Sequence, residues 1–253
     1  MIRTIDEVIT ELDDIVKASV EQQSPLGYFA ALYKRVTVSV RDGIRHGEFE
    51  DNERMEKLDI IFASRYLDAY RSFHSGQNAS QSWLAAFSSS SKRLITLQHL
   101  LLGMNAHISL DLGIAAAETE PQKPLSLKTD FHSINRVLES LINDTQARLT
   151  RIFRPLGIAD RLLGPIDENL SIFSIAYARD KAWTQTLELC LSSDAHREDM
   201  ISRRDLAVAA FSRCIANPRK LSVRLILLAI RILERGDVST RIKILDTQSL
   251  VSS

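Results

Sequence analysis

Apolar side chains recur along this chain at spacings of three and four residues, the period of an amphipathic helix. The pattern covers residues 4–20, returns over 26–46 and 52–73, and continues to the C-terminal third. No stretch alternates apolar and polar residues as a half-buried strand does, and glycine (9) and proline (6) are too few to interrupt helices often. The pattern predicts an all-α fold: a single-domain multi-helix bundle over residues 1–243, followed by a loosely ordered tail over 244–253.

One stretch, residues 94–117, is apolar on nearly every face, so we expect the bundle to form around it as a buried central helix. Three polar residues lie within it: Asn105, His107 and Asp111. His107 and Asp111 are four residues apart and share one face of a helix, and Gly103 leaves space beside the imidazole. Burying such groups costs free energy unless each finds a partner. The stretch therefore predicts one internal polar site.

Proline and glycine mark the remaining boundaries. Residues 118–126 hold two prolines and predict the clearest loop. Prolines also delimit a short segment, 154–165, which precedes a helix expected over 171–191. In the more highly charged C-terminal third, we expect two helices separated at residues 217–218.

Composition narrows the class of protein. Lysine plus arginine (32) equals aspartate plus glutamate (32), so no overall field attracts nucleic acid or an acidic membrane. Cys190 and Cys214 form no CxxC or Cys/His cluster, which argues against a disulfide scaffold and a structural zinc module. The first fourteen residues are acidic and amphipathic, unlike a signal peptide. We expect a soluble, cytoplasmic protein with no nucleic-acid partner.

A membrane span is also disfavoured. Residues 94–117 are long enough to cross a bilayer, but Gln98, His99 and the three polar residues named above would each be costly in lipid. The sequence leaves open whether the protein forms a homo-oligomer, and whether the apolar stripe at 225–233 packs inside or contacts a partner subunit.

Further polar residues share the inward faces of the predicted helices. Asp59, Phe62 and Tyr66 are helical neighbours on one apolar stripe, and Arg65 adjoins them. Four other helix residues belong to the same group of candidates, together with a tryptophan that could line a pocket: Asp130, Asn135, Arg179, Asp180 and Trp183.

These residues permit a metal site. His107 and Asp111 could offer two ligands to one ion, with Asp59, Asp130 and Asp180 supplying others from neighbouring helices. Histidine and carboxylate ligands together suit one divalent metal, zinc or ferrous iron, and a metal-dependent hydrolase is the simplest chemistry.

The same residues permit a metal-free enzyme that acts on a small molecule. His107, backed by Asp111, would be the general base, Arg65 or Arg179 would hold an anionic group, and Tyr66 would donate a proton. Three further residues would contact the substrate: Asn105, Asn135 and Trp183. No GxSxG sequence or other nucleophile motif is present. The alternative is a non-catalytic helical binding or structural module, in which buried polar residues only fix helix packing.

Several of these residues fall within strings that resemble a family. The strings are FASRYLDAY (62–70), LLLGMNAHISLDLGIA (100–115), DFHSIN (130–135) and ARDKAW (178–183). They resemble a bacterial domain-of-unknown-function family whose members carry, in this order, FAxRYL, GMNAHIxxDL, DxxxxN and ARDxAW motifs. The resemblance covers about residues 25–190. It implies that the candidate residues form one constellation, and it implies no particular activity.

A more distant resemblance concerns the His-x-x-x-Asp pair formed by His107 and Asp111. It is similar to the pair that a long buried helix offers to zinc in zinc-dependent phospholipases C and P1-type nucleases. That group uses several further histidines and an amino-terminal ligand, which this chain does not match with its six histidines. A single-metal or metal-free site is therefore the expectation here.

Overall fold

Helices account for all the regular structure in residues 2–153 and 175–247, the part of the chain that this computed structural model describes. The all-α prediction is confirmed. The helices run in the order α1 (Ile5–Glu21), α2 (Leu26–Arg45), α3 (Asn52–His74), α4 (Gln81–Phe87), α5 (Thr96–Ala106), α6 (Leu112–Thr119), α7 (Lys128–Ile152), α10 (Ile175–Leu191), α11 (Asp194–Ala216), α12 (Leu221–Leu233) and α13 (Val238–Asp246).

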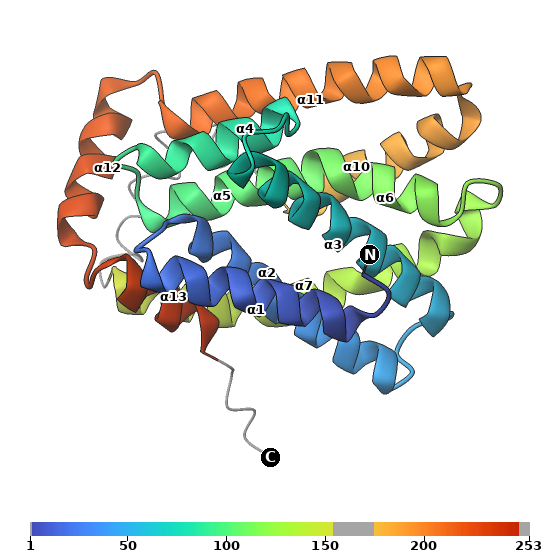
Figure 1. Cartoon of the computed structure of the whole chain (residues 1–253), viewed down its shortest axis with the longest axis horizontal. Coiled ribbons are helices and arrows are strands. Elements are labelled where there is room, and N and C mark those ends of the chain that lie inside the picture. The colour runs from blue at the N-terminus through green and yellow to red at the C-terminus, as the bar shows by residue number, and fades with distance from the viewer. Residues whose placement is uncertain (1, 154–174, 248–253) are drawn as a thin grey trace.

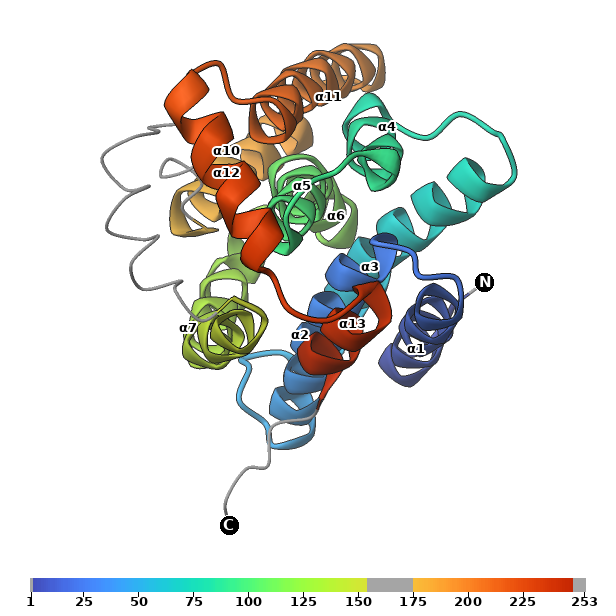
Figure 2. The ribbon, with the colours of Figure 1, turned by 90° about the vertical axis from the view of Figure 1, so that its left-hand side faces the viewer.

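The helices lie on two sides of a central rod formed by α5 and α6. On one side, α1, α2, α3 and α13 pack against one another, and α7 contacts α2 and α13. On the other side, α10 packs on α6, while α11 packs on α4 and α5. Figure 2 shows α5 and α6 between these two groups, with α12 beside α5. The rod therefore meets side chains from nearly every direction.

The central rod runs from Thr96 to Thr119, close to the expected 94–117. By length and composition alone it could cross a membrane, but 83% of its most apolar window is buried inside the protein, as in a core helix. Its first turn is capped by Glu234, whose carboxylate accepts a hydrogen bond from the Thr96 backbone N–H at 2.7 Å.

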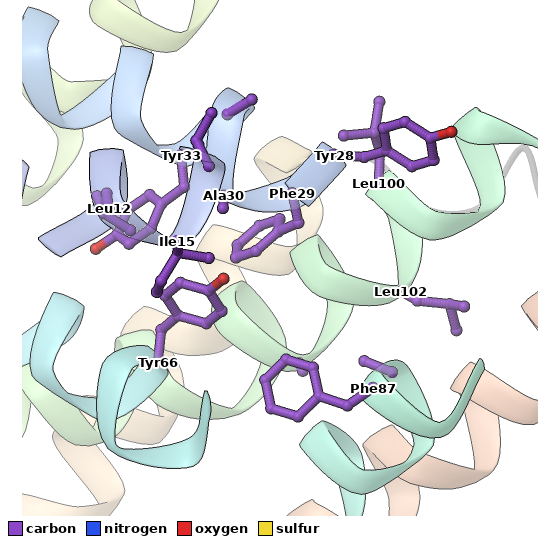
Figure 3. Close-up of a cluster of buried hydrophobic side chains, with 14 of the residues drawn as sticks. Leu12, Ile15, Tyr28, Phe29, Ala30, Tyr33, Tyr66, Phe87, Leu100 and Leu102 are labelled. Atoms are coloured by element: carbon purple, nitrogen blue, oxygen red, sulfur yellow. The ribbon is translucent and has the colours of Figure 1, made fainter. Parts of the chain in front are cut away.

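Aromatic rings join α2 and α3 to the rod. Figure 3 shows Phe29 of α2 between Tyr66 of α3 and the ribbon of α5, and the Phe29 and Tyr66 rings meet edge to face with their centroids 5.2 Å apart. A Cβ at Gly103 would lie only 2.6 Å from Phe29 Cδ2. The space predicted beside the imidazole is therefore occupied by Phe29, and the absence of a side chain at Gly103 lets α2 approach α5.

A buried carboxylate fixes the beginning of α7. Asp130 is fully buried and accepts hydrogen bonds from the backbone N–H groups of Glu50 (2.7 Å) and Asp51 (3.2 Å). Its Oδ2 also accepts from Arg54 Nη2 at 2.7 Å. The loop between α2 and α3 is thereby held against α7 by one side chain.

The C-terminal third differs from the expectation. It contains three helices where two were predicted, because Gly236, with a φ of +73°, allows a turn between α12 and α13. Helix α13 continues to Asp246 with Leu245 buried, so residues 244–246 are part of the packed bundle and not of a loose tail. The predicted segment 154–165, and the first residues of the helix predicted over 171–191, lie outside the described residues.

We predict that Gly103→Ala destabilises the protein by about 1–2 kcal/mol. Alanine normally favours a helix interior over glycine by about 0.5–1 kcal/mol, but the added methyl overlaps Phe29, and overpacking costs about 1–3 kcal/mol. Urea denaturation measures the difference. In the Phe29→Ala background the cost of Gly103→Ala should shrink, since alanine lacks the Cγ and Cδ2 atoms that lie closest to the added methyl. A stabilising Gly103→Ala would contradict the close approach.

We also predict that Asp130→Asn lowers the free energy of unfolding by about 3 kcal/mol, because it leaves Arg54 without its buried counter-ion and weakens the two backbone hydrogen bonds. Asp180→Asn is the control: its carboxylate lies on an exposed position of α10, so its effect should stay within about 0.5 kcal/mol. Equal effects of the two substitutions would contradict a structural role for Asp130.

Candidate functional site

A cavity of about 280 Å³ lies between the central rod and helices α2, α3 and α7, with α10 at its edge. Leucine, isoleucine, valine, methionine and phenylalanine side chains make up most of its wall. The described residues that contribute polar side chains to the wall are Tyr33, Asp59, His107, Thr145, Gln146 and Arg179. A small set of polar groups in an apolar cavity is the usual composition of a site for a small molecule.

His107 faces this cavity from a wide helical turn. Residues His107–Asp111 form a π-helical turn between α5 and α6, where the sequence predicted a continuous α-helix. A π turn accommodates one extra residue, and such turns are frequent at functional sites. The helical period of the apolar residues does not reveal it, because a single inserted residue barely changes a pattern that is apolar on all faces.

The His107 imidazole is held by aromatic rings and not by hydrogen bonds. Phe62 stacks on it, with ring centroids 3.6 Å apart and planes 9° from parallel, and Tyr33 meets it at 4.3 Å. Its Nδ1 lies 3.7 Å from Asp111 Oδ2, too far for a hydrogen bond. Within the described chain, neither ring nitrogen has a hydrogen-bond partner. Burial lowers the pKa of His107 while Asp111 acts in the opposite direction, so the imidazole is neutral at pH 7.

Asp111 is bound by other residues. Trp83 Nε1 donates to its Oδ2 at 2.8 Å, and Arg65 Nε donates to its Oδ1 at 3.0 Å. Asp111 therefore takes its hydrogen bonds from α3 and α4, and His107, which was predicted to be backed by it, donates none. Trp83 was missed from the sequence, where it is only an apolar residue of a short helix. The sequence offered one signal: the indole N–H can only donate a hydrogen bond, so a buried tryptophan needs an acceptor nearby.

Two more cavity residues carry unpartnered polar atoms. Asp59 is 7% exposed, and its Oδ2 has no hydrogen-bond partner among the described residues. Burial, with a contribution from Glu56, raises the pKa of Asp59 to about 7. The hydroxyl of Tyr33 is equally unpartnered, and burial and the charge of Asp59 raise the pKa of that phenol. Tyr33 was also missed, although it follows Phe29 by four residues on the inward stripe of α2.

The structure places two predicted residues in the core outside the cavity. Tyr66 is buried among rings and lies 5.1 Å from Trp83 between centroids, and it does not line the cavity. Burial raises its pKa above that of a free phenol, which makes it a reluctant proton donor. Asn105 donates through Nδ2 to Val208 O and Ser212 Oγ, both at 3.0 Å, and so ties α5 to α11.

The ARDKAW residues form a group at the cavity's α10 edge. Arg179 Nε donates to Asn135 Oδ1 at 2.6 Å, and its Nη2 donates to the Phe131 carbonyl. Its guanidinium also lies 4.7 Å from the centroid of the Phe131 ring, and Trp183 packs on the same ring. Burial lowers the pKa of Arg179 to about 10. Asn135 of α7 thus contacts Arg179, and Trp183 contacts Phe131 of α7, while Asp180 is exposed to solvent.

The five predicted metal ligands are not assembled. Asp130 is occupied by the loop and Arg54, Asp180 is exposed, and both oxygens of Asp111 accept from Trp83 and Arg65. Over the described ranges, no group of three or more histidine, cysteine, aspartate or glutamate side chains is placed to hold a metal ion. His107 and Asp59 are the two candidates that remain at the cavity wall.

Comparison with known proteins locates the chain in one family. No curated protein and no solved structure matches it, so the similarity to zinc-dependent phospholipases C and P1-type nucleases gains no support. A family described as "Family of unknown function (DUF5995)" matches residues 5–218, which span the helices from α1 to the end of α11. The match confirms the prediction that the chain belongs to a domain-of-unknown-function family. The chain belongs to this family of unknown function.

Proposed function

We propose that the protein binds a small, largely apolar molecule in the cavity, with a polar group of that molecule against His107. One observation carries the proposal. Four buried polar atoms, Tyr33 Oη, Asp59 Oδ2 and both ring nitrogens of His107, lack hydrogen-bond partners among the described residues, and their side chains all line the same cavity. Buried polar atoms are nearly always hydrogen-bonded, and leaving one unpaired costs about 1–3 kcal/mol.

The unpartnered atoms suit a neutral polar group. A neutral imidazole offers one donor and one acceptor, and a tyrosine hydroxyl offers both. Asp59 can do the same when protonated, which its pKa of about 7 allows near neutral pH. Hydroxyl, carbonyl and amide groups match this set. Arg179, the cationic side chain that the described residues place at the cavity wall, already donates to Asn135 and Phe131, so an anionic group has less support.

The rest of the molecule should be apolar and larger than one ring. The cavity wall is mostly aliphatic and aromatic, and burying apolar surface there is favourable by about 25 cal/mol per Å². An apolar cavity of about 150 Å³ is known to hold benzene, whereas this cavity has about 280 Å³. Bicyclic or branched molecules are the appropriate size class.

Acid–base catalysis on the bound molecule is the second candidate. The observation that favours it is the presence, at one cavity wall, of an unpartnered neutral His107, which can accept a proton, and of Asp59, whose pKa of about 7 lets it gain or lose a proton near neutral pH. This is enzyme chemistry without a metal. Metal-dependent hydrolysis has less support, because only His107 and Asp59 of the five predicted metal ligands line the cavity.

We predict that 2-indanol binds the protein about fivefold more tightly than indane, which has the same skeleton without the hydroxyl, because one net hydrogen bond contributes about 1 kcal/mol. Isothermal titration calorimetry measures both affinities. In His107→Phe the preference should disappear, since the phenyl ring keeps the stacking on Phe62 but offers no hydrogen bond.

Two variants control this measurement. His74→Phe changes an exposed histidine of α3 and should leave both affinities unchanged. Val36→Trp fills the cavity from α2 and should weaken both compounds together. If ordered water satisfies the four atoms instead, neither compound should bind. Failure of both compounds to bind, or a hydroxyl preference that persists in His107→Phe, would refute the proposal.

We predict that stability falls as pH rises from about 4 to about 7, and that Asp59→Asn removes most of this dependence. In the unfolded chain an aspartate ionises near pH 3.9, whereas the folded protein holds the Asp59 proton until about pH 7. Raising the pH through this window therefore favours the unfolded state. The neutral amide avoids the penalty and should stabilise the protein at pH 8 by a few kcal/mol.

Chemical denaturation at pH 4.5, 6 and 8 measures this effect. Asp180→Asn, which removes an exposed carboxylate, is the matched control and should keep the wild-type profile. If Asp59→Asn leaves the profile unchanged, Asp59 does not titrate near neutral pH and loses its place in the acid–base candidate.

A further inference from the structure

Helix α12 has an apolar stripe that the described residues leave uncovered. Its inner face packs Val223, Leu227 and Ile230 against Ile95 and Phe153. Its outer face carries large side chains that the described residues leave at least half exposed, at spacings of four, three and four residues: Leu221 (67%), Leu225 (58%), Leu228 (50%) and Ile232 (74%). A helix that is apolar on both faces but covered on one is unusual for a surface helix. The outer stripe is thus available to a partner.

The same part of the chain is basic, although the whole chain has no net charge. Between Asp205 and Glu234 the sequence contains five basic residues and no acidic one. Arg219 and Arg224 are exposed, and Arg224 lies one turn before Leu228 on the flank of the stripe. The five basic residues are Arg213, Arg219, Lys220, Arg224 and Arg231. An apolar stripe flanked by cationic side chains complements a surface that has an anionic outer layer over an apolar interior.

The position of α12 allows contact with an extended surface. Figure 1 shows α12 at the left-hand end of the molecule, where it runs across the direction of the longer helices to its right. With 13 residues it is only about 20 Å long, too short to span the roughly 30 Å core of a bilayer. It can therefore lie on a membrane and not across it.

We propose that α12 is an interfacial helix that docks the protein onto an anionic lipid membrane. The leucine and isoleucine side chains would enter the boundary between headgroups and acyl chains, and the arginines would contact anionic headgroups. The family match ends at residue 218, so this docking surface lies just beyond the matched region. The docking does not depend on what occupies the cavity.

Charge disfavours a second copy of the chain as the occupant. A two-fold contact through this stripe brings α12 against itself and sets Arg224 and Arg231 of one copy near those of the other. Like charges across an interface are unfavourable. Nucleic acid fits the charge but not the four aliphatic side chains, since single strands use aromatic platforms and α12 has no aromatic residue.

Sedimentation of the full chain with vesicles tests the proposal. Wild-type protein is expected to bind vesicles of phosphatidylcholine with 30% phosphatidylglycerol at least fivefold more strongly than pure phosphatidylcholine, and binding should weaken in 0.5 M NaCl because salt screens the arginines. Leu225→Glu/Leu228→Glu should lower the partition coefficient at least tenfold, and Arg219→Gln/Arg224→Gln severalfold. Leu206→Glu, at an exposed leucine of α11, is the matched control and should bind like wild type.

Measurements of stability and oligomeric state show whether a membrane, another part of the chain or a second copy covers the stripe of α12. If the stripe faces solvent in the free protein, Leu225→Glu/Leu228→Glu keeps the wild-type Tm and monomeric mass. A clear drop in Tm would show that another part of the chain covers the stripe, and a wild-type dimer that becomes monomeric in this variant would show a second copy. Either result overturns the proposal, as does wild-type protein that ignores anionic vesicles.

Discussion

The carboxylate of Asp111 is the constraint around which the centre of the protein is arranged. A buried charge is expensive unless it is paired and hydrogen-bonded, and Asp111 is only 2% exposed. Arg65 of α3 and Trp83 of α4 satisfy its two oxygens, which positions both helices against the rod. Because these two donors satisfy Asp111, the carboxylate does not need a hydrogen bond from the neighbouring His107. The His107 ring nitrogens therefore stay available to a molecule in the cavity.

The cavity likewise depends on how closely helices may approach. Gly103 brings α2 onto α5, which places the Phe29 and Tyr33 rings next to His107. Helix α7 is held at its beginning through Asp130, and a space between α2, α7 and the rod is left open. The apolar wall and its few polar atoms are therefore products of the same packing that stabilises the bundle.

The sequence was sufficient for the helices because their boundaries follow local rules. Apolar periodicity and cap residues place α1, α3 and the central rod within a few residues of their observed ends. It was also sufficient to single out His107 and Asp59 as inward-facing polar residues. It could not show which carboxylate meets which partner, since Asp130, Asp111 and Asp180 look alike along the chain. Their different roles arise from contacts between helices far apart in sequence, and Trp83 and Tyr33 were missed for the same reason.

The π turn at His107–Asp111 determines which way each side chain of α6 faces. One extra residue rotates each later side chain of α6 by about 100° relative to an uninterrupted α-helix. Gly113 faces α10 in that register, where a Cβ would lie 2.8 Å from the Ala182 carbonyl oxygen. Without the extra residue a neighbour with a side chain would take this place and the two helices would be forced apart. The inserted residue therefore couples the orientation of the imidazole to the seam between α6 and α10, so that neither can be altered in the course of evolution without the other.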